Sequence, residues 1–393
     1  MKQRIVHIIN SFEYGGAEAM LCNLVLRSDR QRFEPHVVSL IDDLTVAGPL
    51  IEAGVPLVTM GFRPGLPDPW AMVRLVRHLR RLRPSVVQTW MDHSNLIGGL
   101  AGSLVRGARV VWGVHHCDHA LSKRSTRLTV AACAKLSRRV PSRVVCCSQH
   151  ARDLYIARGF AAEKMTFIPN GFDTTRFSPD PQARREVRRE LGLTNDVVLI
   201  GLVARYDPLK DHANFLHAAA MLRATHPHVR FVLCGREVDA SNGELMRMIG
   251  ELGLGEACHL LGPRRDMQRI YAAIDLLASS SVMEAFPLAL GEAMACGTVC
   301  VATDVGDSAL IVGETGRIVP PRAPGALASA WREMLSLPAG ERARLSASAR
   351  RRVCEMFELD AVTRRYEALY AEVLADREPA PRAPAWTVQE RPL

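Results

Sequence analysis

The segment TTRFSPDPQARREVRRELGL, residues 174–193, is rich in proline and charge and interrupts a regular pattern of short apolar runs and longer helical stretches. Before it, β-branched runs alternate with helical patterns from RIVHII at residues 4–9 to MTFIPNGFD at residues 165–173. After it, a second series runs from VVLIGLVA at residues 197–204 to VCVAT at residues 299–303. Such alternation predicts parallel strands joined by right-handed crossovers, and therefore two doubly wound α/β domains.

The length of the chain also favours two domains. Its 393 residues exceed what one hydrophobic core usually holds, and domains of about 150–200 residues follow from that limit. We expect an N-terminal domain at residues 1–172, a C-terminal domain at residues 173–356 and a linker near residues 172–182. The last helical stretch, residues 357–375, precedes a proline-rich tail, residues 376–393, whose composition predicts disorder. Because parallel sheets bind ligands at the carboxyl ends of their strands, we expect the ligand between the domains.

The composition is that of an ordinary globular protein. Hydrophobic residues make up 48% and charged residues 23% of the chain. The longest apolar runs fall far short of the roughly 20 residues that span a bilayer, and no signal-peptide cleavage site follows the N-terminal run. The ten cysteines include no C-x-x-C motif, so we expect reduced, mostly buried thiols. These features together predict a cytoplasmic protein.

The formal charge of +9 is concentrated in two basic clusters. Residues 74–83 (RLVRHLRRLR) form an arginine-rich helical face, and residues 123–143 interleave basic and apolar side chains at helical spacing. A solvated helix accounts for each cluster, and so does an amphipathic helix lying on an anionic membrane surface. No nucleic-acid motif or aromatic-interleaved basic stripe accompanies them, so we expect no nucleic-acid partner.

The segment SVMEAFPLALGEAMACG, residues 281–297, carries two glutamates around a predicted helix. We expect the helix at residues 287–296, because its proline suits the first turn and the glycine that follows suits the C-terminal cap. Glu284 then lies in the preceding loop and Glu292 about a turn and a half inside the helix. The amides around Phe286 point out of the helix N-terminus, where anions bind. A glutamate at a helix start can also simply be a surface residue that the helix dipole stabilises.

Two other loops carry residue types that bind phosphate. In GLVARYDPLKD, Arg205 and Lys210 follow a predicted strand, where an arginine fork and a lysine charge can neutralise a diphosphate. Exposed loop charge is the alternative interpretation. In GGAE, Gly15 and Gly16 open the first predicted helix and leave its backbone amides accessible to a ligand. The segment lacks the G-x-G-x-x-G pattern, which argues against a dinucleotide oxidoreductase.

The stretch HHCDH, residues 115–119, contains three histidines and a cysteine. These residues are too closely bunched to match a common zinc spacing, so we predict no metal site. His115 follows a predicted strand and therefore lies at the expected cleft, where a neutral imidazole can hydrogen-bond a substrate. An ordinary loop histidine is the alternative.

These motifs together resemble the large retaining glycosyltransferase family 4, the group 1 glycosyltransferases of GT-B fold. The resemblance extends to about residue 375 and is specific in the combination of its parts. It rests on EAFPLALGE at residues 284–292, GLVARYDPLKD at residues 201–211, GGAE at residues 15–18, IPNGFDTTRF at residues 168–177 and ACGTVCVATDVGD at residues 295–307.

The resemblance implies that the C-terminal domain holds a UDP- or GDP-linked sugar, which passes with retained anomeric configuration to an acceptor on the N-terminal domain. Glu292 would hold the ribose, and Arg205 and Lys210 the diphosphate. Glu284 would contact the donor sugar, as a positioning and electrostatic residue. His115 would contact the sugar. The resemblance implies further contacts with the donor at Gly16, Pro263, Arg264, Phe286, Pro287 and Leu288. No D-x-D clamp is apparent, so the two cations could replace a metal, and no cofactor is expected.

Two positions depart from the family pattern. Ala285 stands where glycine is common, and Val299 where proline is common; both changes affect sugar specificity more than activity. The family also implies that residues 357–375 return to the N-terminal domain. We therefore expect a transferase that builds a cell-surface polysaccharide or glycolipid, such as lipopolysaccharide, on a glycan or lipid-linked acceptor, with possible peripheral contact to the inner membrane. A sugar-nucleotide epimerase of the same fold and a non-catalytic partner subunit are the alternatives.

Overall fold

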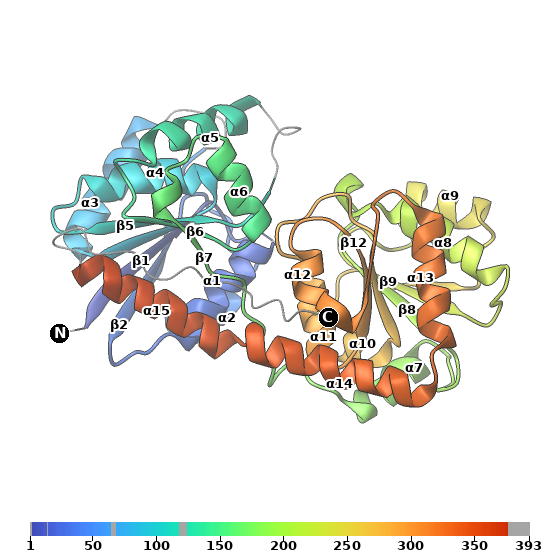
Figure 1. Cartoon of the computed structure of the whole chain (residues 1–393). Coiled ribbons are helices and arrows are strands. Elements are labelled where there is room, and N and C mark those ends of the chain that lie inside the picture. The colour runs from blue at the N-terminus through green and yellow to red at the C-terminus, as the bar shows by residue number, and fades with distance from the viewer. Residues whose placement is uncertain (1, 14, 64–67, 118–123, 376–393) are drawn as a thin grey trace.

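The computed structural model describes residues 2–13, 15–63, 68–117 and 124–375, which form two parallel-sheet domains lying side by side (Figure 1). The tail, residues 376–393, for which the composition predicts disorder, lies outside the described residues. The two sheets confirm the predicted fold class of two doubly wound α/β domains.

The N-terminal domain contains a seven-stranded parallel sheet in the order β3-β2-β1-β4-β5-β6-β7. Its strands are β1 (Gln3–Ile9), β2 (Phe33–Ser39), β3 (Leu57–Thr59), β4 (Val86–Trp90), β5 (Arg109–Val114), β6 (Arg143–Cys146) and β7 (Met165–Phe167). Its helices are α1 (Gly16–Arg27), α2 (Gly48–Glu52), α3 (Pro69–Leu82), α4 (Asp92–Ser103), α5 (Arg124–Leu136), α6 (Gln149–Ala157) and the short 3₁₀ turn Ala162–Lys164. The strand order reverses between β1 and β4, and sheets of this kind bind ligands at the carboxyl ends of the strands beside such a reversal.

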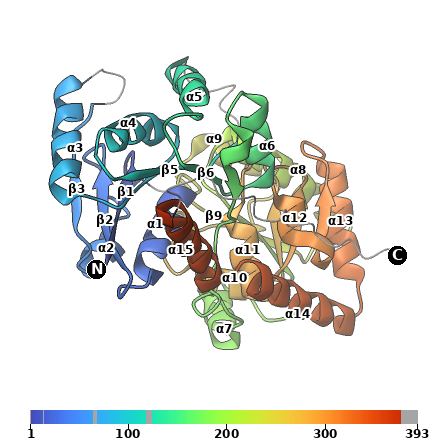
Figure 2. The same cartoon turned by 60° about the vertical axis from the view of Figure 1, so that its left-hand side comes forward.

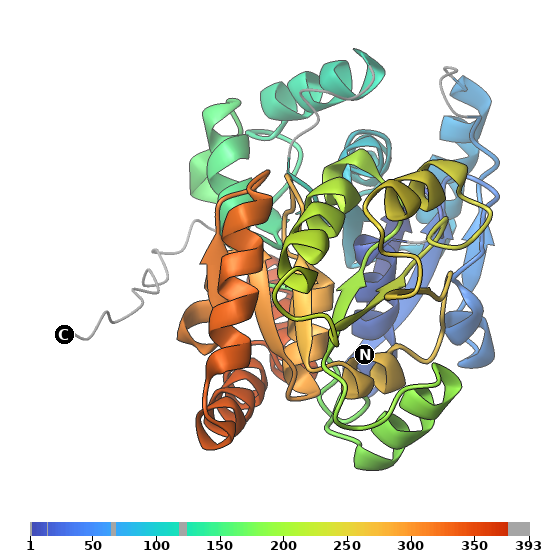
Figure 3. The same cartoon turned by 90° about the vertical axis from the view of Figure 1, so that its right-hand side faces the viewer.

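The C-terminal domain repeats this plan with six strands in the order β10-β9-β8-β11-β12-β13. The strands are β8 (Leu199–Val203), β9 (Arg230–Cys234), β10 (Cys258–Leu260), β11 (Leu276–Ser279), β12 (Val299–Thr303) and β13 (Arg317–Val319). The helices are α7 (Pro181–Glu190), α8 (His212–Arg223), α9 (Gly243–Glu251), α10 (Met267–Ala273), α11 (Leu288–Ala295), α12 (Ser308–Val312), α13 (Pro324–Ser336) and α14 (Ala339–Met356), with 3₁₀ turns at Pro208–Lys210 and Gly313–Thr315. The last helix, α15 (Leu359–Ala375), packs on the N-terminal domain. Figure 3 shows this domain from its own side, with α8 and α13 packed together over the sheet.

The central strands are apolar on both faces because helices cover both sides of each sheet. All five residues of β4 and all five of β12 are buried. The edge strand β13, which the sequence pattern did not predict, has only one buried residue out of three. Short edge strands of this kind lack the continuous apolar run that marks a buried strand, so periodicity alone misses them.

The last two helices connect the domains. Helix α14 runs along the C-terminal domain, and α15 continues beneath the N-terminal sheet beside α1 (Figures 1 and 2). Leu359, Tyr366 and Val373 of α15 are buried among residues of β1, β4 and β5. At the junction the rings of Phe172, Phe286 and Phe357 pack together, with centroid separations of 5.6–6.4 Å. A shared aromatic cluster therefore links the two cores.

Several boundaries differ slightly from the sequence expectation. Helix α11 begins at Leu288, because Pro287 has an extended ψ of 106° and acts as the N-cap. The basic stretch that the pattern predicts as helical to residue 143 ends its helix at Leu136. All ten cysteines are free, and eight of them are buried, as expected. Among the described residues, none of the helices combines the length and the apolar character that crossing a bilayer requires.

Candidate functional site

Lys210 and Glu284 form an ion pair at the carboxyl edge of the C-terminal sheet. Lys210 follows β8, and Glu284 lies in the 280–287 loop between β11 and α11, so adjacent parallel strands bring them together. Lys210 Nζ lies 2.5 Å from Glu284 Oε1, and Ser281 donates to the same oxygen at 2.7 Å. Their side chains are only 19% and 14% exposed. Partial burial strengthens this ion pair relative to one in open solvent.

Arg205 also lies at this edge, where it forms an ion pair with Asp207. Its guanidinium donates to Asp207 at 3.0 and 2.8 Å, and its side chain is 42% exposed. Burial raises the pKa of Glu18 on α1 to about 7, and the charge of Arg205 opposes that rise. The charge of Arg205 therefore acts on Glu18 across the domain boundary. Both cations of the predicted pair are held by carboxylates in the unliganded chain.

Glu292 projects from α11 toward the domain junction. The hydroxyl of Tyr271 donates to Glu292 Oε2 at 2.9 Å. Burial raises the pKa of Glu292 to about 7, and the hydrogen bond from Tyr271 partly opposes the rise. A small cavity bounded by Asn23 of α1, Phe172 and Glu292 lies at this point. The structure thus places Glu292 in the cleft but joins it to Tyr271 rather than to Glu284.

The start of α1 faces the start of α11 across the cleft. A Cβ atom at Gly16 would lie 3.3 Å from Leu288 Cδ1, so any larger residue would press on the opposite domain. At Gly15 a Cβ atom would collide with the carboxylate of Glu18, which folds back over the helix N-terminus. Phe286 is 5% exposed and anchors the 280–287 loop in the aromatic junction. The space beside the two glycines is therefore taken up by Glu18 and by Leu288 of the opposite domain.

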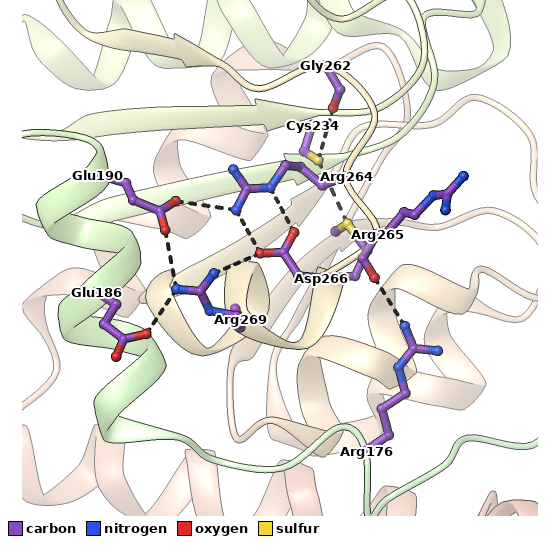
Figure 4. A network of polar contacts seen from close by, with 10 residues as sticks. Arg176, Glu186, Glu190, Cys234, Gly262, Arg264, Arg265, Asp266 and Arg269 are labelled. Atoms are coloured by element: carbon purple, nitrogen blue, oxygen red, sulfur yellow. Dashed lines mark hydrogen bonds and ion pairs between the residues drawn. The ribbon is translucent and has the colours of Figure 1, made fainter.

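The loop at residues 262–264 lies after β10, and its arginine belongs to a charged network (Figure 4). Arg264 donates to Asp266 at 2.8 and 2.7 Å and to Glu190 of α7 at 3.3 Å. These carboxylates raise the pKa of Arg264 above its usual range. The guanidinium of Arg264 therefore holds α7 in place. The backbone around Pro263 takes no part in these ion pairs.

The two adjacent histidines after β5 have different surroundings. The ring of His115 stacks on Trp90 at 4.6 Å, both of its nitrogens are buried, and burial lowers its pKa to about 3. His116 instead lies 2.9 Å from the carboxylate of Asp92, which also accepts hydrogen bonds from Tyr155 at 3.0 and 3.1 Å. Burial raises the pKa of Asp92 to about 7.

The Asp92, His116 and Tyr155 cluster lies at the carboxyl edge of the N-terminal sheet, at the ends of β4 and β5. Sequence reasoning chose His115 in this stretch and missed the cluster. Consecutive residues point in opposite directions at a strand end, and only the position of Asp92 decides which histidine is paired. The two adjacent histidines in the sequence drew attention to this strand end, but the sequence did not identify Asp92 as the partner of one of them.

The described side chains do not form a metal-binding cluster. Within residues 2–13, 15–63, 68–117 and 124–375, no group of three or more histidine, cysteine, aspartate or glutamate side chains could hold a metal ion. The last two residues of HHCDH, Asp118 and His119, lie outside the described residues.

Two family models match the chain in tandem. The model for glycosyltransferase family 4 matches residues 14–176, and the model for glycosyl transferases group 1 matches residues 183–352. The first covers most of the N-terminal domain and the second most of the C-terminal domain, including Arg205, Lys210 and both glutamates.

Individual relatives agree with these models. The putative glycosyltransferase EpsF of Bacillus subtilis is 26% identical over 318 residues, which cover 77% of this chain and 79% of the relative. The D-inositol 3-phosphate glycosyltransferase of Corynebacterium jeikeium is 34% identical over 197 residues, but the match covers 48% of this chain and about half, 47%, of that relative.

Among solved structures, Anabaena Alr3699/HepE in complex with UDP superimposes with a TM-score of 0.83 at 24% identity and covers 95% of this chain and 100% of that one. Its complex with UDP-glucose gives the same TM-score at 22% identity, with 94% and 99% covered. The likeness shows the GT-B fold. The two family models, which together match residues 14–176 and 183–352, show that this chain belongs to the group 1, family 4 type of glycosyltransferases.

Proposed function

We propose that the chain is a retaining glycosyltransferase that moves a sugar from a UDP- or GDP-linked donor to a glycan or lipid-linked acceptor. The observation that carries this proposal is the mostly buried pair of Lys210 and Glu284 beside Arg205 at the carboxyl edge of the C-terminal sheet. The HepE complexes with UDP and UDP-glucose support a nucleotide-sugar donor and favour UDP over GDP.

The arrangement suits the chemistry of a diphosphate leaving group. When the bond to the sugar breaks, negative charge develops on the diphosphate, and cations already in position stabilise it without reorganisation. Lys210 and Arg205 supply that charge once the diphosphate takes the place of their carboxylate partners. Glu284 then remains beside the sugar, held by Ser281, and orients its hydroxyls. In this proposal Lys210 and Arg205 supply the positive charge that a metal ion would otherwise provide, so chelators leave the rate of transfer unchanged.

A panel of UDP- and GDP-sugars tests the proposal. The purified chain is expected to release nucleotide from at least one donor when a lipid-linked or glycan acceptor is added, with EDTA having no effect. The product's anomeric configuration, determined by NMR, should match that of the donor. Isomerisation of the donor without an acceptor would instead indicate an epimerase, and no release from any donor would reject transfer.

Glu292→Gln is expected to stabilise the fold while weakening donor binding. Because burial raises the pKa of Glu292 from 4.5 to about 7, the folded chain holds an extra proton between these values. The free energy of unfolding therefore falls as pH rises from about 4.5 to about 7 and is level above that. An uncharged amide at residue 292 avoids this loss of stability. The free energy of unfolding of the variant should therefore exceed that of the wild type by about 1–3 kcal/mol at pH 8 and by almost nothing at pH 4.5.

Denaturant unfolding at the two pH values measures this gain, and UDP calorimetry measures the loss of binding. Glu18 and Asp92 also have raised pKa values, but they are present in both proteins and cancel in the difference. An equal gain at both pH values would contradict the proposed ionisation of Glu292.

We also propose that the N-terminal domain attaches to an anionic membrane surface that carries the acceptor. Helix α4 packs between α3 and α5, which bear the two basic clusters. The exposed side of α3 combines Trp70, 75% exposed, and Val73, 45% exposed, with the exposed arginines that follow them. Leu128 on α5 is 64% exposed. An apolar tip beside clustered positive charge is the combination that binds an anionic interface.

The double variant Trp70→Ser, Val73→Ser is expected to lower the fraction bound to phosphatidylglycerol vesicles at least fivefold, because the apolar contact is lost. Flotation at low salt measures the bound fraction. Ile51→Ser is the matched control, because Ile51 is 56% exposed on α2, which packs on the opposite face of the sheet. Equal flotation of the double variant and wild type would reject attachment through α3.

A further inference from the structure

A carboxylate of the C-terminal domain caps a helix of the N-terminal domain. Asp307 precedes α12 and is 4% exposed. Its side chain accepts hydrogen bonds from Ser148 Oγ at 2.9 Å, from the amide of Gln149 at 2.8 Å and from that of His150 at 3.1 Å. These groups form the N-terminal end of α6, where the helix dipole favours negative charge. The cap therefore comes from a residue 159 positions away, across the domain boundary.

The backbone of the same segment holds the 280–287 loop. The amide of Asp307 donates to the carbonyl of Ala285 at 2.9 Å. Gly306 has a φ of +55°, and a Cβ atom there would collide with the carbonyl groups of Glu284 and Ala285. The backbone at this point therefore lies directly against the loop that carries Glu284. Residues 306 and 307 connect that loop to α6 through one side chain and one amide.

We propose that Asp307 is a positioning residue that clamps the two domains together and sets the place of Glu284 relative to the N-terminal domain. Its kinetic consequence rests on the proposed transfer reaction, whereas the clamp itself does not. Transfer needs the donor on one domain and the acceptor on the other at a fixed separation, and small displacements of reacting groups cost large factors in rate. A carboxylate bound to both domains at once provides such a constraint.

A purely local role has a different signature. If Asp307 only capped α6, its loss would loosen that helix and leave the 280–287 loop as it was. If it clamps the domains, both segments loosen together. Alanine keeps the amide that donates to Ala285, but without the side-chain bonds to α6 the backbone that carries this amide is no longer held in place. Hydrogen exchange followed by mass spectrometry distinguishes the two cases without any substrate.

In Asp307→Ala we expect amide exchange to rise about tenfold or more both at residues 149–157 and at residues 280–287. Asp304→Ala is the matched control, because Asp304 is an exposed aspartate three positions earlier on the same loop. Faster exchange in α6 alone, or equal exchange in both variants, would overturn the proposal. Because this measurement needs no donor, it decides on the clamp even if the chain proves inactive on every sugar nucleotide.

The kinetic arm separates positioning from donor binding. Asp307→Ala is expected to lower kcat for transfer to acceptor ten- to thirtyfold, while the Kd of UDP changes less than about threefold. Ser148→Ala, which removes one of the three bonds from the other domain, should cause a smaller loss of kcat and keeps the test informative if the aspartate variant fails to fold. In the double variant the serine substitution should add little further loss of kcat, since its bond to the other domain is already gone and the remaining bond, from the amide of Ala151 at 3.1 Å, lies within α6. Additive losses, or a Kd that rises in step with the fall in kcat, would count against the clamp.

Discussion

Lys210→Ala is expected to lower kcat/KM for transfer by about 10²–10³, the usual loss when a preorganised charge is removed from a developing anion. Lys210 Nζ lies 2.5 Å from Glu284 in a site where both side chains are less than one-fifth exposed. Its ammonium group therefore acts in a medium less polar than water, where its attraction to a diphosphate is strong. The substitution also leaves the carboxylate of Glu284 without its cation, which further repels the leaving group.

Steady-state kinetics with the best donor from the panel measures this loss. Arg247→Ala is the matched control, because Arg247 is a cation of the same domain paired with Glu251 at 2.7 Å, with both side chains 60% exposed. Exposed helical pairs contribute only about 0.3–0.5 kcal/mol, so this variant should retain nearly full activity. If the two variants lost activity equally, Lys210 would have no special place in the reaction.

Glu284→Gln is expected to lower kcat by about 10² while UDP binds at least as tightly as before, because the interaction lost is one that acts on the sugar. The amide keeps the shape of the side chain and can still accept the hydrogen bond from Ser281. The amide no longer forms an ion pair with Lys210, so the charge of Lys210 then interacts with the diphosphate alone. Catalysis and nucleotide affinity should therefore move in opposite directions.

Calorimetry with UDP and kinetics with the intact donor separate these two effects. A higher Kd for UDP together with an unchanged kcat would indicate that Glu284 contacts the nucleotide rather than the sugar. The double variant with Lys210→Ala should be less impaired than the product of the two single losses, because the residues contact each other.

The sequence predicted the fold well because the relevant signals are local. Strand and helix periodicity, interrupted at residues 174–193, predicted two doubly wound domains, and both sheets confirm it. Pro287 and the glycine after α11 placed that helix to within one residue at each end. The motif carrying Glu284 and Glu292 could be recognised because its residues lie within nine positions of one another.

Other features of the site depend on contacts that no local pattern records. The alternation of strand residues could not say whether His115 or His116 meets a partner, since Asp92 comes from a different strand end. The sequence predicted that Arg264 contacts the donor, but it did not indicate that its guanidinium binds Glu190, a residue of α7 that is 74 positions away. The charge of both residues was visible in the sequence, but their proximity was not.

The sequence by itself therefore determined the two domains, the order of their elements and the family motifs, because hydrophobic periodicity and turn residues act over a few positions. Only the tertiary structure decided that Lys210 and Glu284 are paired, that His115 is stacked on Trp90, and that Asp307 caps α6 of the other domain. These contacts join segments 25 to 159 positions apart, and they form only where the crossovers bring strand ends and helix starts to one cleft.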